Sequence, residues 1–175
     1  NAVMKFVKKK SQWIRHKQGA EILLVDDDSS ENNGGPAPPP ESPYADVASL
    51  MAAALDANNY TYDTYVVQVG ENGPSIGVLM NYGLVIWMTG YSWSSAITSS
   101  DWNTLSTYIN LGGHVWLIGE DIVYSEDTSW GPVPADHPLY QYFGVQSVQQ
   151  DAGTPDPVVG RTGTITEGVS YVTQS

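Results

Sequence analysis

The chain has 175 residues and no cysteine, which is enough for one sizeable hydrophobic core and excludes disulfides and thiol chemistry. Its 19 acidic and 7 basic residues give a net charge of −12, but six of the basic residues lie within the first 17 positions, which hold no acid. Residues 1–17 therefore carry +6, and residues 18–175 carry +1 − 19 = −18. The negative charge of residues 18–175 argues against nucleic acid as their partner.

The first 20 residues predict a basic arm in front of a single domain spanning residues 21–175. Large apolar side chains accompany its charges, so it is not a purely solvated tail. The acidic body of a neighbouring copy supplies the complementary charge, while nucleic acid, an anionic surface and the arm's own body are alternative partners. The residues expected to make the contact are Lys5, Phe6, Lys8, Lys9, Lys10, Trp13, Ile14, Arg15 and Lys17.

From residue 21 onward, the apolar patterns predict strands that alternate with helices. Residues 21–26 predict a buried strand, and a glycine- and proline-rich loop follows over 29–43. Apolar residues at 44, 47, 50, 51, 54 and 55 have the spacing of an amphipathic helix and predict a helix over 44–58 with these positions on its inner face. A second strand is predicted at 62–69 and one helical turn at 74–79.

The same alternation continues in the second half. Residues 84–89 predict a third buried strand, and Thr98 with Asp101 fits a capping box that opens a helix ending at Leu111. Residues 114–118 predict a fourth buried strand, in which His114 is expected to be a satisfied core residue. A short helix is predicted over 137–143, with an irregular β tail from Val145. The inner face of the capped helix is expected to carry Trp102, Leu105, Tyr108 and Ile109.

Nearly continuous apolar strands between helices favour a mainly parallel sheet that is covered on both faces. With right-handed crossovers, the expected fold class is α/β, a three-layer sandwich with a flavodoxin-like sheet, plus the basic arm and the irregular β tail. No run of about 18 apolar residues is present, so no membrane span is predicted.

Several segments, taken in order, resemble class I glutamine amidotransferase-like domains, and most nearly the non-catalytic version carried by secreted multidomain proteins. The resemblance covers roughly residues 20–170 and implies an extracellular location. Such domains usually continue with further strands, which leaves open whether the chain is a fragment or takes its last strands from elsewhere. The segments are 22–28 (ILLVDDD), Tyr44 with 54–60 (ALDANNY), 82–90 (YGLVIWMTG), Gly112-Gly113 with the strand that follows, and 143–145 (FGV).

The elbow after the fourth strand departs from the catalytic branch of that family. The resemblance implies a cysteine or serine there and a His–Glu pair further on, whereas this chain has Glu120 and Asp121, and no histidine follows His137. A carboxylate without a partner is a poor general base, so structural capping at the elbow is expected. The resemblance therefore implies a protein that is not an enzyme.

Acids follow the first strand at Asp26, Asp27 and Asp28, which also resembles the metal pocket of response-regulator receivers. Receivers need an acid after the third strand and a later lysine. Here the third strand ends in Thr89 and no lysine follows Lys17, so we reject that interpretation. Clustered carboxylates either bind a cation, for which calcium suits an extracellular setting, or cap helices and loops by accepting N–H bonds.

Aromatic residues in loops form the remaining candidate group: Tyr91, Trp93, Tyr124 and Trp130. They either stack on sugar rings or partner side chains, or pack the loops over the sheet. The glycine-rich pieces match no nucleotide-binding motif, and no second histidine stands at zinc-ligand spacing. No cofactor other than calcium is therefore expected.

The leading hypothesis is a non-catalytic interaction or assembly module of an extracellular protein. It would form a homo-oligomer, closed as a ring or open as a filament, or would contact other domains of its parent protein. The alternatives are a metal-assisted hydrolase that uses the acidic strand-end edge and a carbohydrate-binding module that uses the loop aromatics.

Overall fold

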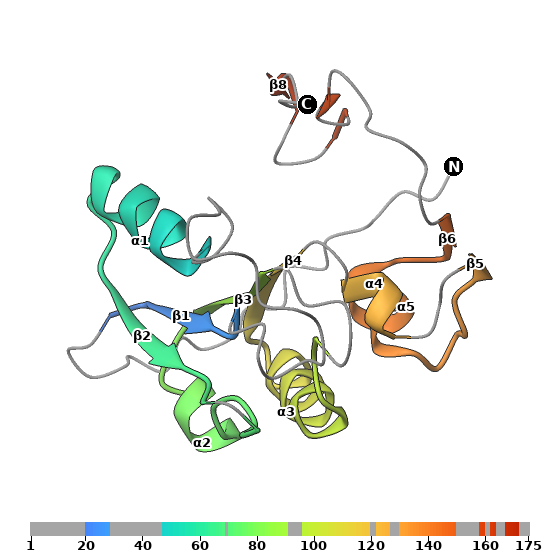
Figure 1. Ribbon diagram of the computed structural model, residues 1–175, viewed down its shortest axis with the longest axis horizontal. Helices are drawn as coiled ribbons and strands as arrows, with labels where there is room; N and C mark the ends of the chain where they lie inside the picture. The colour runs from blue at the N-terminus through green and yellow to red at the C-terminus, as the bar shows by residue number, and fades with distance from the viewer. Residues whose placement is uncertain are drawn as a thin grey trace.

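The computed structural model describes residues 20–28, 47–68, 70–90, 96–119, 122–126, 130–149, 158–159, 162–163 and 167–171. Its centre is a parallel sheet of four strands in the order β2-β1-β3-β4 (Figure 1). The strands are β1 (Ile22–Asp26), β2 (Tyr62–Val66), β3 (Leu84–Gly90) and β4 (His114–Gly119). This confirms the predicted α/β class with a parallel sheet, and the strand order is compatible with a flavodoxin-like fold.

Helices lie on both faces of the sheet (Figure 1). One face carries α1 (Val47–Ala57), and the other carries α2 (Ile76–Leu79) and α3 (Ser99–Asn110). Because side chains alternate along a strand, β1 and β3 supply both cores. The smaller core under α1 contains Ile22, Leu24, Leu55, Ile86 and Met88. The larger core under α2 and α3 contains, among others, Leu23, Val25, Val85, Trp87, Leu105 and Tyr108.

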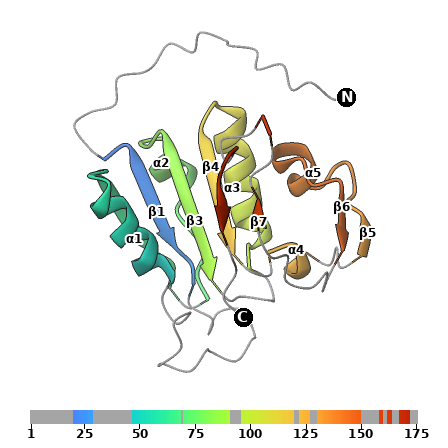
Figure 2. The same ribbon diagram turned by 90° about the horizontal axis from the view of Figure 1, so that it is seen from above.

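Strand β4 differs from the prediction of a fully buried strand. Its first four residues alternate between exposed and half-buried and the last two are half-buried, with His114 exposed and Trp116 54% exposed. The prediction that His114 is a core residue is therefore wrong. The physical reason is position: β4 is the edge of the sheet within the described residues, and α1 packs against β1 and β3. In Figure 2, α1 lies on the β1 side of the sheet, away from β4.

The helices begin and end close to the predicted positions. Thr98 and Asp101 form the expected capping box of α3, and α2 starts after Ser75, two residues later than Pro74 would suggest. Helix α1 buries Ala48 and Leu55 but leaves Leu50 61% exposed, so the prediction that position 50 faces the core is wrong.

After β4 the chain leaves the sheet for a group of short elements beside α3. They are α4 (Ile122–Ser125), β5 (Trp130–Pro132), α5 (Pro138–Phe143) and β6 (Ser147–Gln149), with β5 and β6 antiparallel. A second small antiparallel pair, β7 (Val158–Val159) with β8 (Ser170–Tyr171), lies apart from the sheet in Figure 1. Within the described residues, no helix is both long and apolar enough to cross a lipid bilayer.

Candidate functional site

Asp27 is the most unusual side chain at the carboxyl end of the sheet, where open α/β sheets bind their ligands. It is 7% exposed, and its Oδ2 accepts a 2.9 Å hydrogen bond from the indole Nε1 of Trp87. Its backbone N–H donates to the carbonyl of Met88, which fixes it beside β3. Burial raises the pKa of Asp27 to about 7, the Trp87 bond opposes that rise, and the charge of Asp101 adds to it.

Asp28 has a different role from Asp27. Its Oδ2 accepts hydrogen bonds from the backbone N–H groups of Val47 and Ala48, at 2.7 and 3.1 Å, so it caps the start of α1. Asp28 therefore contacts α1, and Asp27 contacts Trp87. Among the described residues, no three histidine or acidic side chains gather into a group that could hold a metal ion. Calcium at Asp26, Asp27 and Asp28 stays a prediction, and its test is given below.

Asp101 joins the start of α3 to the loop before α2. Its Oδ2 lies 2.6 Å from the hydroxyl of Thr98, and its Oδ1 accepts from the N–H of Gly73 at 2.9 Å. Gly73 packs against the ring of Trp87 so closely that a Cβ would overlap the ring. The capping motif identified Asp101 from sequence, but its bond to Gly73 has no sequence signature. We call Asp27, Gly73, Trp87 and Asp101 the strand-end cluster.

Thr89 and Gly119 are in contact where β3 and β4 end. A Cβ on Gly119 would overlap the hydroxyl of Thr89. Thr89 is fully buried, and its hydroxyl has no hydrogen-bond partner among the described residues. The elbow acids Glu120 and Asp121 lie outside the described residues, so their predicted role is untested.

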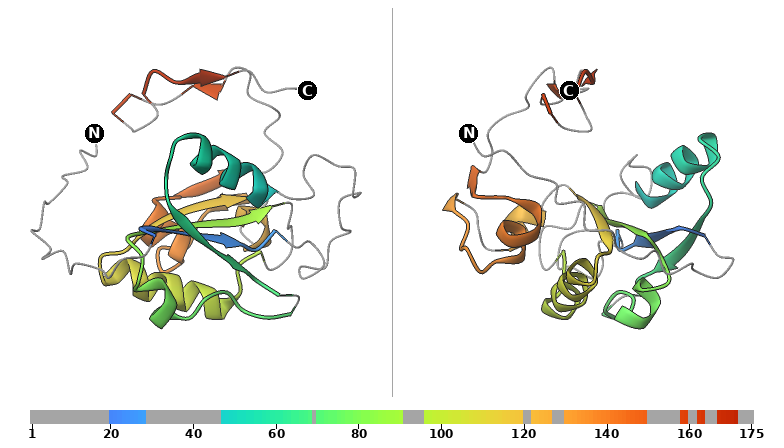
Figure 3. Two further views of the ribbon diagram at one scale, coloured as in Figure 1. Left: turned by 90° about the vertical axis from the view of Figure 1, so that its left-hand side faces the viewer. Right: turned by 180° about the vertical axis from the view of Figure 1, so that it is seen from behind.

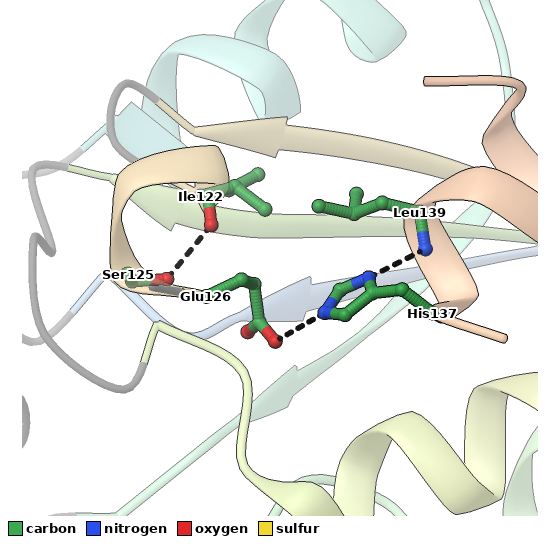
Figure 4. Close-up of polar contacts among 5 residues, drawn as sticks. All are labelled: Ile122, Ser125, Glu126, His137 and Leu139. Atoms are coloured by element: carbon green, nitrogen blue, oxygen red, sulfur yellow. Dashed lines mark hydrogen bonds and ion pairs between the residues drawn. The ribbon is translucent and has the colours of Figure 1, made fainter. Parts of the chain in front are cut away.

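A histidine–carboxylate pair, which the sequence did not predict, lies between α4 and α5 (Figure 4). Nε2 of His137 is 3.3 Å from Oε2 of Glu126, and Nδ1 accepts a 3.1 Å hydrogen bond from the N–H of Leu139. Because Nδ1 is an acceptor, Nε2 carries the proton in the neutral ring. The ring also makes an edge contact with Trp102, at 6.2 Å between centroids.

The engagement of both ring nitrogens decides what this pair can do. A catalytic histidine needs one nitrogen to orient the ring and the other to exchange a proton with a nucleophile. In His137, Nδ1 caps α5 and Nε2 faces Glu126, which follows α4. The pair therefore links α4 to α5, and neither ring nitrogen is left to accept a proton from a nucleophile.

The other candidate residues are only partly described. Tyr124 is on α4 with 37% of its surface exposed. Trp130 begins β5, but its side chain, like Tyr91 and Trp93, lies outside the described residues, as does the arm. Whether the four aromatics come together is therefore untested, and the aromatic edge stays a prediction.

Charge distribution is the strongest large-scale feature of the described body. Eleven of the 19 acids lie in the described residues, which contain no lysine or arginine. Glu126 lies against Nε2 of His137. The eleven are Glu21, Asp26, Asp27, Asp28, Asp56, Asp63, Glu71, Asp101, Glu126, Asp136 and Glu167.

In comparisons with known proteins, no family model, no curated protein and no solved structure matches this chain.

Proposed function

We propose that this chain is a non-catalytic interaction or assembly module of an extracellular protein, of the amidotransferase-like type. Its basic arm docks on the acidic body of a neighbouring copy. The observation that carries the proposal is the set of eleven acids in the described body without a lysine or arginine. Six of the chain's seven basic residues stand in the arm, so one copy holds both halves of a complementary contact.

The residues available for catalysis also support a module without enzymatic activity. The chain has no cysteine, both ring nitrogens of His137 are engaged, and Asp28 caps α1. Contact between unlike patches is head-to-tail, which generates a ring or an open filament.

Deleting residues 1–17 tests the proposal. Mass is measured by light scattering at low and high salt for the full chain, for the deletion, and for a full-length control in which the six basic residues of the arm are replaced by glutamine. We expect oligomers for the full chain, monomers for the deletion, and salt-sensitive assembly, because screening acts over about 8 Å at physiological ionic strength. Residual assembly of the glutamine control would measure the apolar share of the contact. A mass unchanged by the deletion contradicts the proposal.

One observation favours the metal-assisted hydrolase as a second candidate. A carboxyl group whose pKa is raised to about 7 at the carboxyl end of a parallel sheet has the protonation behaviour of a general acid or base. A screen of glutamine, amide and ester substrates, with calcium and with chelator, tests it on the wild type, Asp27→Asn and Glu120→Gln. We expect no turnover, and activity abolished by either substitution would favour the hydrolase.

A further inference from the structure

We propose that the arm docks on the outer edge of β2, adding to the sheet as an extra strand. This inference rests on the proposed function and names the surface that the function needs. We define the β2 edge as Asp63, Thr64 and Val66 of β2, together with Tyr60 just before the strand and Asp56 near the end of α1, which bonds to Tyr62.

The β2 edge has the backbone geometry that strand addition requires. Strand β2 pairs with β1 along one side, from Tyr62 opposite Ile22 to Val66 opposite Asp26, and the described residues place no strand on its other side. Figure 3 (left) shows β2 in front of the rest of the sheet. An edge strand presents unpaired N–H and C=O groups to an incoming chain. Five residues span about 17 Å, which a short part of the arm can cover when extended.

The side chains of the β2 edge match the arm in charge and in apolar character. Asp63 and Asp56 are exposed acids, and the hydroxyl of Tyr82 donates a 2.9 Å bond to Asp63. Tyr60 and Val66 are 60% and 52% exposed. An arm that combines lysines with Phe6, Trp13 and Ile14 can pair with the acids and cover the apolar residues.

The same charges select the arm over other occupants of the edge. If β2 paired with β2 of a second copy, Asp63 of each copy would approach a like charge across the pair, which is destabilising. At the opposite edge, the described strand β4 contains no acid between His114 and Gly119, whereas β2 carries Asp63 within the strand. The β2 edge is therefore the sheet edge that fits the arm.

Disulfide trapping tests the contact directly, because the natural chain contains no cysteine. The test variant carries Ser11→Cys in the arm with Thr64→Cys on β2. The matched control carries Ser11→Cys with Asn103→Cys, at an exposed position on α3. We expect disulfide-linked multimers on a non-reducing gel, formed at least several-fold faster by the test variant than by the control at low salt.

The other outcomes of the trapping experiment separate the two proposals. Trapping no faster than the control, with arm-dependent assembly intact, overturns the β2 edge and leaves the proposed function standing. If the test variant instead forms an intramolecular disulfide between positions 11 and 64 and stays a monomer, docking between copies is overturned.

A second measurement compares two acids of the body by their effect on assembly. Asp63→Asn changes the β2 edge, and Asp136→Asn changes an exposed acid after β5. We expect the first to weaken assembly roughly threefold to fivefold, the equivalent of one cross-strand charge pair, and the second to leave it unchanged. Equal effects would count against the edge.

Discussion

The indole of Trp87 in β3 donates its hydrogen bond to Asp27 across the carboxyl end of β1, between residues 60 positions apart in sequence. Trp87 is fully buried and Asp27 almost so, and Gly73 leaves room for the ring. The bond satisfies the indole N–H but holds a carboxyl group where its charged form is poorly solvated. Packing in the strand-end cluster is therefore coupled to the protonation state of Asp27.

The first prediction concerns stability and pH. Asp27 has a pKa of about 7 in the folded protein against an ordinary value of 3.8, so the folded state binds more protons between these pH values. The contribution of Asp27 to the free energy of unfolding should therefore fall as pH rises from about 4 to about 7, by up to roughly 4 kcal/mol, and then level off.

The substitution Asp27→Asn isolates this effect, because asparagine keeps an acceptor for Trp87 and cannot ionise. We expect urea unfolding to show that the free energy of unfolding of the variant, relative to wild type, rises by up to about 3 kcal/mol between pH 5 and pH 8. Asp26, Asp28 and Asp101 are present in both proteins, so the variant removes the Asp27 charge together with its repulsion by these three acids. A difference that is the same at both pH values would contradict the prediction.

The second prediction concerns Asp101, which caps α3 and holds Gly73. Replacing it with alanine removes acceptors from the N–H of Gly73 and from the backbone and hydroxyl of Thr98. We expect Asp101→Ala to lower the free energy of unfolding by about 2–4 kcal/mol, more than loss of a cap alone. Chemical denaturation measures the loss, with Asp136→Ala as an exposed control. A loss no larger than in the control would show that this network contributes little.

The sequence predicted most of what local patterns determine. The apolar runs of β1 and β3 and the capping box of α3 are local signals, and the structure confirms them. The exposure of β4 was not predictable in this way, because Trp116 occupies a strand-like apolar run whose burial depends on which strands α1 covers.

The candidate site was less predictable than the fold. Asp26, Asp27 and Asp28 form one cluster in the sequence, but successive side chains on an extended chain point in opposite directions. Asp27 therefore meets Trp87, and Asp28 meets the start of α1. The pairing of Glu126 with His137 depends on how α4 and α5 pack, which no spacing rule encodes.

The third prediction concerns the contact between Thr89 and Gly119. A methyl group at residue 119 would overlap the Thr89 hydroxyl, and it would also press on Ile122 at about 3 Å. We expect Gly119→Ala to lower the free energy of unfolding by about 1–3 kcal/mol, and Thr89→Ala in the same chain to restore part of that loss. A double-mutant cycle by chemical denaturation measures the coupling. Additive effects would contradict the close contact.

Thr89 gives a fourth prediction of opposite sign. Its buried hydroxyl lacks a partner among the described residues, and valine has nearly the same shape without the polar atom. Thr89→Val should therefore raise the free energy of unfolding by about 1 kcal/mol, measured by denaturation. Thr107→Val is the control, since that hydroxyl is exposed and donates to the carbonyl of Asn103. A clear loss on Thr89→Val would reveal a partner for the hydroxyl.

The last prediction separates capping from calcium binding at Asp28. Its Oδ2 accepts two N–H groups at the start of α1, so Asp28→Ala should lower the free energy of unfolding by about 1–2 kcal/mol. Asp28→Ser offers a replacement cap, and we expect it to recover most of that loss.

Thermal melts of wild type in calcium and in chelator should coincide if the Asp28 carboxylate serves only to cap α1. A cation held by Asp26, Asp27 and Asp28 would instead raise the melting temperature with calcium concentration, because a ligand that binds the folded state stabilises it by mass action. Asp28→Ser would then lose the calcium-dependent shift while keeping its cap, which makes the two roles distinguishable in one pair of melts.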